Sequence, residues 1–198
     1  MSATKSLNCY SHHAPKMDWF TQYFSLKNDF DDNHSLGSQM YSFFKRFLRD
    51  AELLDASGFS YTAQVIDSLG LDNDCSWALM LANLAYTPQV NWAVKRLHIN
   101  EAYGKDYVLS LLVADGAKDI WSSFSRLADL PLGTVGFGYP SKEKGRMVAI
   151  TRMPWKNPNP LVILYSLYKF AEACGNYYQF TLTRLLNHDI ESDGVSPT

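Results

Sequence analysis

One stretch, residues 120–153, decides the fold, and it reads IWSSFSRLADLPLGTVGFGYPSKEKGRMVAITRM. In residues 120–128 the apolar side chains recur at helical spacing, which predicts an amphipathic helix. From residue 133 to 139 apolar and small residues alternate with a period of two, and residues 147–153 are rich in Val, Ile and Thr. Both patterns are typical of strands, so a β-hairpin is expected after the helix.

A second helix is expected just before this stretch. Val108, Leu111 and Leu112 form an apolar stripe that stops at Asp115-Gly116. Two helices joined by a short turn and followed by a hairpin have the order of a winged helix-turn-helix. The predicted fold class is therefore mainly α with one β-hairpin: a helical domain that contains a winged helix-turn-helix.

The remaining patterns predict further helices around this unit. The clearest stripe runs from Met40 to Leu54, with Ser57-Gly58 as its stop, and Thr62 and Asp72 or Asp74 are candidate helix caps. The predicted organisation is an irregular lead-in with a short helix (1–38), a helical subdomain (39–100), a winged helix-turn-helix-like unit (105–156), a C-terminal helical pair (157–188) and a polar tail (189–198).

The composition excludes several classes of protein. The chain has 198 residues, of which 46% are hydrophobic and only 19% charged, so it is too apolar to be disordered. No apolar run is long enough to span a membrane, and no secretory signal is visible. Three cysteines, an odd and sparse set, favour a reduced cytoplasmic setting over a disulfide framework. The abundant apolar surface must be buried in a core or covered by a partner.

Basic residues gather in the predicted hairpin of a chain whose net charge is −2. Five cations stand against the single acid Glu143: Lys142, Lys144, Arg146, Arg152 and Lys156. A basic hairpin tip beside a helix-turn-helix suits the phosphate backbone of duplex DNA. The second helix of the pair adds Ser122, Ser123, Ser125 and Arg126 as donors, whereas Asp119 and Asp129 on the same surface repel phosphate. The predicted nucleic-acid-binding residues are Ser122, Arg126, Lys142, Lys144 and Arg146.

Two alternative functions stay open. Winged helices also dock proteins, so a pure protein-interaction module without nucleic-acid binding is an alternative. A thiol-dependent reductase using Cys9 or Cys174 is a third hypothesis, although the C-terminal end of a helix at Cys174 disfavours a thiolate.

No catalytic motif, cofactor or metal site is predicted. Cys9, His12 and His13 have metal-binding side chains but lack the paired spacing of a zinc site. The glycine-rich residues 133–138 match neither the dinucleotide fingerprint nor the lysine-terminated phosphate loop.

Several strings in the chain resemble the C-terminal region of bacterial phosphoadenosine phosphosulfate (PAPS) reductase-like proteins. They are Arg152-Met-Pro-Trp155, Asn157-Pro-Asn-Pro160, the segment from Ile163 to Gly175, the segment from Tyr177 to Leu186 and the segment from Ile190 to Pro197. Shorter likenesses occur at residues 18–20, 44–50 and 130–133. The resemblance covers the chain from about residue 9 onward.

The resemblance implies a role beside a catalytic module rather than catalysis. Members of that family carry an ATP-pyrophosphatase domain with a Ser-Gly-Gly-Lys-Asp-Ser type phosphate loop, and relatives act in sulfur metabolism, DNA phosphorothioation and phage defence. That string is absent here. The expected function is a non-catalytic region that binds DNA or docks an ATP-pyrophosphatase domain or subunit. The family pattern continues past Thr198, which implies a fragment, a split gene or an isolated domain.

Overall fold

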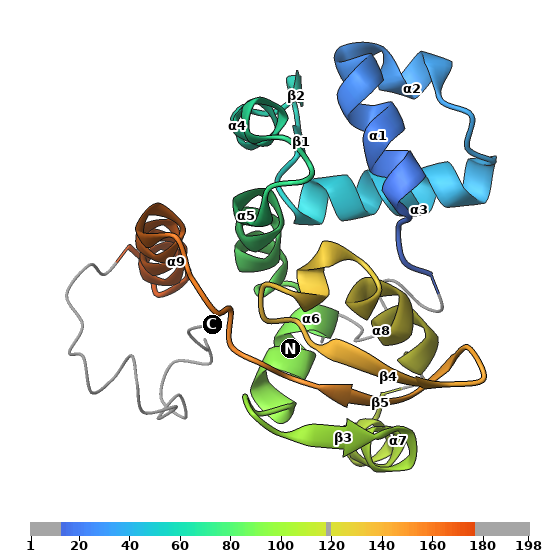
Figure 1. The fold of residues 1–198 in the computed structure, drawn as a ribbon. Coiled ribbons are helices and arrows are strands. Elements are labelled where there is room, and N and C mark those ends of the chain that lie inside the picture. Colours follow the sequence, from blue (N-terminus) through green and yellow to red (C-terminus); the bar gives the residue numbers. More distant parts are fainter. Residues whose placement is uncertain (1–12, 118–119, 177–198) are drawn as a thin grey trace.

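The computed structural model describes residues 13–117 and 120–176 (Figure 1). About 58% of these residues are helical. The elements are α1 (Met17–Leu26), η1 (Lys27–Asp29), α2 (Phe30–Asn33), α3 (Ser38–Asp50), β1 (Leu54–Asp55), β2 (Gly58–Phe59), α4 (Tyr61–Leu69), α5 (Asp74–Leu84), α6 (Pro88–Arg96), β3 (Ala102–Gly104), α7 (Lys105–Ala114), α8 (Trp121–Ala128), η2 (Pro131–Gly133), β4 (Tyr139–Glu143), β5 (Arg146–Thr151) and α9 (Pro160–Ala173).

Aromatic packing holds the N-terminal helices together. The ring of Phe20 on α1 meets those of Phe44, Phe47 and Trp77 edge-on, with centroids 5.1–5.8 Å apart. Edge-to-face geometry is the favoured arrangement of such rings. The hydroxyl of Tyr23 donates to the Leu53 carbonyl at 2.5 Å, which fixes α1 against the chain that leaves α3.

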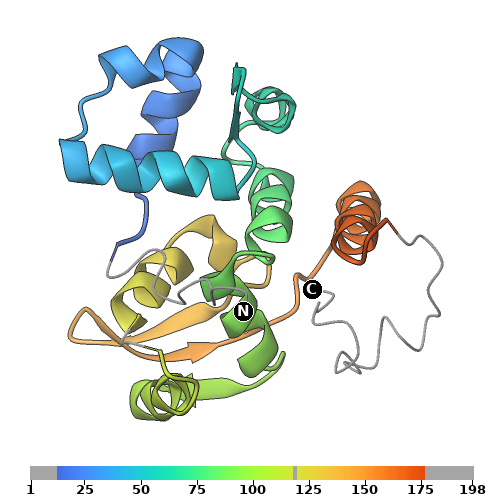
Figure 2. The same cartoon turned by 180° about the vertical axis from the view of Figure 1, so that it is seen from behind.

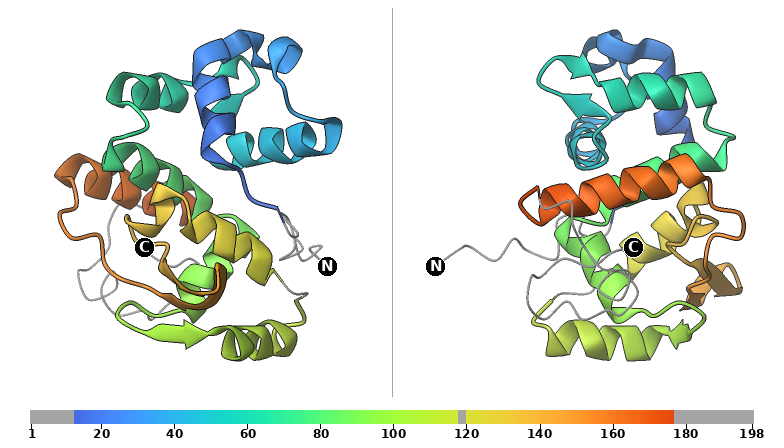
Figure 3. Two further views of the ribbon diagram at one scale, coloured as in Figure 1. Left: turned by 45° about the vertical axis from the view of Figure 1, so that its right-hand side comes forward. Right: turned by 90° about the vertical axis from the view of Figure 1, so that its left-hand side faces the viewer.

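The second group of elements is built around a three-stranded antiparallel sheet in the order β3-β5-β4. Helix α8 packs on this sheet, and the Trp121 indole donates to the Met147 carbonyl at 3.2 Å. Helix α7 follows β3 directly. Figures 1 and 2 show α5 between this group and the N-terminal helices, and Figure 3 shows α9 lying along α5.

The two groups share one hydrophobic core. A continuous cluster of buried side chains runs from Ala14 to Val162 and includes Phe20, Trp77 and Phe124, each at most 1% exposed. No break in burial separates the N-terminal helices from the sheet.

The fold class predicted from the sequence was wrong in its strand content. The described residues contain two antiparallel sheets, of two and three strands, instead of one hairpin, and the winged helix-turn-helix assignment is not confirmed. Residues 102–104, which fall between the predicted helical subdomain and the predicted winged helix-turn-helix-like unit, form β3, whose three residues are too few to show a period. Residues 54–59, expected as the end of a helix, contain β1 and β2, because the helix of that stripe ends at Asp50.

The glycine-rich run was also misassigned. Residues 134–138 were predicted as a strand, but β4 begins only at Tyr139. Gly136 and Gly138 have φ angles of 116° and 137°, which side-chain-bearing residues rarely adopt, so the run turns instead of extending. Its apolar side chains, Val135 and Phe137, are buried all the same.

Two helices are capped by residues close to, but different from, the predicted ones. Helix α4 is capped by Ser60, whose hydroxyl accepts from the Ala63 N–H at 3.0 Å, rather than by Thr62. Helix α5 is capped by Asn73, which lies between the two aspartates predicted for that role. The predicted helix at 177–186 and the polar tail lie outside the described residues.

Candidate nucleic-acid interface

The serines of helix α8 that were predicted as phosphate donors lie on different faces of the helix. Ser122 and Arg126 are exposed and lie one turn apart, on the side opposite the buried Phe124. Ser123, also expected as a phosphate donor, is fully buried, and its hydroxyl donates to the His13 carbonyl at 2.8 Å. Ser123 is therefore a structural residue, whereas Ser122 and Arg126 remain accessible.

The β4–β5 connection projects three of the predicted cations. Lys144 and Gly145 both have positive φ angles, of 48° and 77°, as a two-residue turn with the twist of a hairpin requires. Lys142, Lys144 and Arg146 are exposed around this turn, at the edge of the molecule in Figure 1. Ser122 and Arg126 together with these three residues are called the α8–turn surface below.

An ion pair joins the two halves of the α8–turn surface. The ammonium group of Lys142 on β4 lies 2.5 Å from a carboxylate oxygen of Asp129, the residue that follows α8. Asp129 follows Arg126 by three residues, so it faces the same side of the helix. The pair brings the hairpin beside α8 and also places one negative charge within the surface.

The other two basic residues of the sequence cluster lie elsewhere. Arg152 is buried, and its guanidinium donates to the carbonyls of Val94 (3.0 Å), Leu97 (2.6 Å) and Gly136 (3.2 Å). Burial lowers the pKa of Arg152 to about 10. This side chain satisfies carbonyls at the end of α6 and in the glycine-rich turn, so it takes no part in an external basic face. Lys156 lies past the end of β5.

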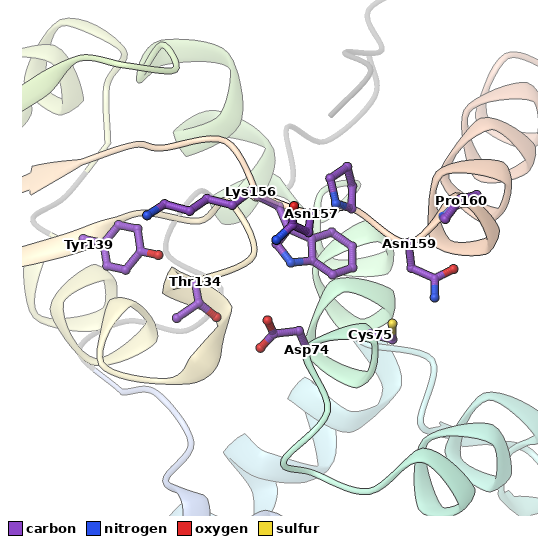
Figure 4. Close-up of a pocket in the computed structure, with 10 residues that line it drawn as sticks. Asp74, Cys75, Thr134, Tyr139, Lys156, Asn157, Asn159 and Pro160 are labelled. Carbon is purple, nitrogen blue, oxygen red and sulfur yellow. The ribbon is translucent and has the colours of Figure 1, made fainter.

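Lys156 lines a cleft that sequence analysis did not anticipate (Figure 4). The cleft, about 570 Å³, lies between the start of α5, the η2–β4 segment and residues 155–160. Figure 4 shows Asp74 on one side of it and Lys156 on the other, with Thr134 and Tyr139 between them. An adjoining cavity of about 600 Å³ shares Asp74 and extends to Asp129. The sequence alone does not predict this cleft, because its lining residues come from three separate segments.

The cysteines show no reductase arrangement among the described residues. Cys75 lines the cleft near the first turn of α9, whereas Cys174 follows the last turn of that helix, and both are free thiols. A helix of fourteen residues is about 21 Å long, which is too far for a disulfide. Cys9 lies outside the described residues.

Metal ligands are likewise not assembled in the described part of the chain. No group of three or more His, Cys, Asp or Glu side chains that could hold a metal ion occurs there. His13 packs its ring against Phe43, with centroids 5.7 Å apart. Its predicted neighbours Cys9 and His12 are outside the described residues.

Comparisons with family models, with curated proteins and with solved structures give no match to this chain. Among the described residues, no helix has both the length and the apolar character needed to cross a bilayer.

Proposed function

We propose that this chain is a non-catalytic region that binds the phosphate backbone of duplex DNA through the α8–turn surface. One observation carries the proposal: all five of its side chains are exposed, and four of them are cations, one on α8 and three on the neighbouring β4–β5 hairpin. A helix face beside a projecting basic turn offers both charge and hydroxyl donors to phosphates.

The net charge of this surface is lower than the sequence cluster suggested. Asp129 offsets Lys142, and Glu143 lies in register with Arg146 on the neighbouring strand. Arg126, Lys144 and Arg146 have no ion-pair partner among residues 13–117 and 120–176. A few available cations predict modest, strongly salt-dependent binding that is dominated by the phosphate backbone.

The resemblance to PAPS reductase-like proteins supplies the setting for this proposal. We assign the chain as an accessory region of such a protein, which holds DNA beside an ATP-pyrophosphatase domain or subunit in cytoplasmic sulfur chemistry or DNA phosphorothioation. Two of the resembling strings contain a residue with a local structural role. Arg152 fixes the end of α6, and Asn159 caps α9 by accepting from the Leu161 N–H at 2.9 Å.

The test is a salt titration of duplex DNA binding. The triple variant Lys142→Gln/Lys144→Gln/Arg146→Gln is expected to bind more weakly than the unmodified chain and to show a flatter dependence of log K on log salt. The matched control removes three exposed cations elsewhere, Lys16→Gln/Arg46→Gln/Arg49→Gln, and is expected to bind nearly as well.

Two outcomes decide between this proposal and its alternatives. Equal losses in both triple variants would mean that total charge alone drives binding and would reject the α8–turn surface as the site. Absence of duplex binding at low salt in the folded protein, together with capture of an ATP-pyrophosphatase partner, would favour the protein-interaction module.

A further inference from the structure

The cleft lined by Lys156 holds polar side chains that have no partner within the described part of the chain. The Asp74 carboxylate, the Lys156 ammonium group and the Tyr139 hydroxyl all line it, and none of them makes an ion pair or a hydrogen bond with residues 13–117 or 120–176. Figure 4 shows the Asp74 carboxylate and the Tyr139 hydroxyl pointing toward the same part of the cleft. These groups are therefore available to a bound molecule.

The charges of the cleft are separated. Asp74 lies on one side and Lys156 on the other (Figure 4). The adjoining cavity shares Asp74 and adds Asp72 and Asp129, and the described residues that line it include no base. Because Asp129 is neutralised by Lys142, Asp72 and Asp74 supply the negative charge at this end. A molecule that matches both ends carries a cation toward Asp74 and an anion toward Lys156.

Aromatic side chains also line the cleft. Trp155 packs against the core and is half-buried, and Tyr139 is 40% exposed. A guanidinium group stacks on aromatic rings and pairs with both oxygens of a carboxylate, whereas an ammonium group acts as a compact point charge. The combination of Asp74 with Tyr139 therefore suits a guanidinium better than an ammonium group.

The size and charge of the cleft favour a small molecule over a nucleic-acid strand. Its volume of about 570 Å³ is within the range of sites that bind small molecules. The carboxylates of Asp72 and Asp74 repel phosphate, so a DNA backbone is disfavoured here. Ligand binding in this cleft is thus independent of DNA binding by the α8–turn surface.

We propose that this cleft binds a small guanidinium-bearing zwitterion of the amino-acid class, such as free arginine. The guanidinium pairs with the Asp74 carboxylate beside the Tyr139 ring, and the ligand carboxylate pairs with the Lys156 ammonium group. Because Asp74 and Lys156 are exposed to water, each pair is weak, and the expected dissociation constant is in the millimolar range.

NMR of the isotope-labelled full chain tests the site, with free arginine and argininamide as probes and no DNA present. Argininamide keeps the guanidinium but lacks the carboxylate. Arginine is expected to shift the indole N–H resonance of Trp155, which is identified by its loss in Trp155→Phe, and to bind more tightly than argininamide. The indole resonances of the buried Trp19 and Trp92 check that each variant is folded.

Two variants separate the two ends of the site. Asp74→Asn is expected to weaken the binding of both probes by about three- to fivefold, because it removes the charge that faces the guanidinium. Lys156→Gln is expected to weaken only the binding of arginine and so to abolish its advantage over argininamide. The controls Asp106→Asn and Lys105→Gln make the same changes on exposed residues of α7 and are expected to leave binding unchanged.

Three results would overturn the proposal. The first is the absence of a saturable shift of the Trp155 resonance at millimolar arginine. The second is weakening by the control variants as large as that by the matching variants in the cleft. The third is equal binding of arginine and argininamide to the unmodified chain, because the anionic end of the ligand would then have no role.

Discussion

The Lys142 ammonium nitrogen lies 2.5 Å from the Asp129 carboxylate, where β4 passes the end of α8. Both side chains are about two-fifths exposed (41% and 42%), so the attraction is screened by water and salt and is expected to stabilise the fold by at most ~1 kcal/mol. The ion pair has a larger effect on the charge of the α8–turn surface. Asp129 neutralises Lys142, which would otherwise be available to a phosphate.

Removal of this carboxylate is therefore expected to improve DNA binding. Asp129→Asn releases Lys142 and is expected to tighten duplex binding at low salt and to steepen the salt dependence by about one phosphate contact. The control Asp106→Asn makes the same charge change on an exposed residue of α7 and should have a smaller effect. If the two variants bind alike, Asp129 has no specific effect on the proposed DNA-binding surface.

Arg152 is expected to be among the most sensitive positions for folding. Arg152→Met leaves the carbonyls of Val94, Leu97 and Gly136 without their donor. The expected loss in the free energy of unfolding is about 3 kcal/mol, measured by urea denaturation. Arg146→Met, at an exposed position of the turn, should change it by less than about 0.5 kcal/mol. A loss for Arg152→Met no larger than this would contradict the structural role of the buried guanidinium.

Two glycines offer a matched test of close backbone packing. A Cβ at Gly133 would lie 2.7 Å from the Ala128 carbonyl oxygen and 2.9 Å from that of Gly138, whereas a Cβ at Gly104 meets nothing within 4 Å. Gly133→Ala is expected to destabilise the fold by about 1–3 kcal/mol, and Gly104→Ala by less than about 0.5 kcal/mol, in thermal or urea unfolding. Similar values for the two changes would show that the η2 turn relaxes readily.

Buried tyrosines make the stability fall in alkali. Burial, with the nearby carboxylates of Asp55 and Asp31 adding to it, raises the pKa of Tyr23 well above its ordinary value of 10.0. The folded protein therefore holds this proton more tightly than the unfolded chain. The contribution to stability is complete below pH 10 and is lost as the pH rises through the pKa of the folded state.

The variant Tyr23→Phe isolates this contribution. It lacks the hydrogen bond to Leu53 and is expected to be about 1 kcal/mol less stable at neutral pH, but to lose less stability above pH 10 than the unmodified protein. Urea unfolding across the alkaline range measures both effects. Tyr86, whose pKa burial raises to about 12, remains in both proteins and gives a common background slope. Parallel curves for the two proteins would contradict the assignment to Tyr23.

The long helices could be predicted from the sequence because their apolar spacing reports burial directly. The stripe around Phe44, Phe47 and Leu48 lies in α3, and the one around Phe124 and Leu127 lies in α8. The short strands could not be predicted, because β3 has three residues and finds its place only by pairing with β5, which lies far along the chain. The segment around Gly136 and Gly138 was predicted as a strand because the two glycines alternate with Val135 and Phe137, but their positive φ angles depend on the tertiary structure.

The α8–turn surface could be predicted only in part, because some of its features have a local sequence pattern and others depend on contacts between separate elements. The turn at Lys144-Gly145 has a local signal, since lysine and glycine occupy a two-residue connection between strand-like runs. Charge counts could not show that Arg152 is buried or that Lys142 meets Asp129, because both facts depend on contacts between separate elements. The cleft beside Lys156 is likewise formed by segments distant in the sequence.

The continuous core from Ala14 to Val162 has a consequence for how this chain can be divided. Trp77 contacts the ring of Phe20, and the cluster that contains them also reaches Phe124 and Ile150 beside the sheet. A cut between residues 100 and 105, where the predicted helical subdomain ends and the predicted winged helix-turn-helix-like unit begins, would open this cluster along its middle. The smallest fragment that could be transferred into another protein therefore includes both the N-terminal helices and the sheet. This fragment is expected to unfold in a single cooperative transition.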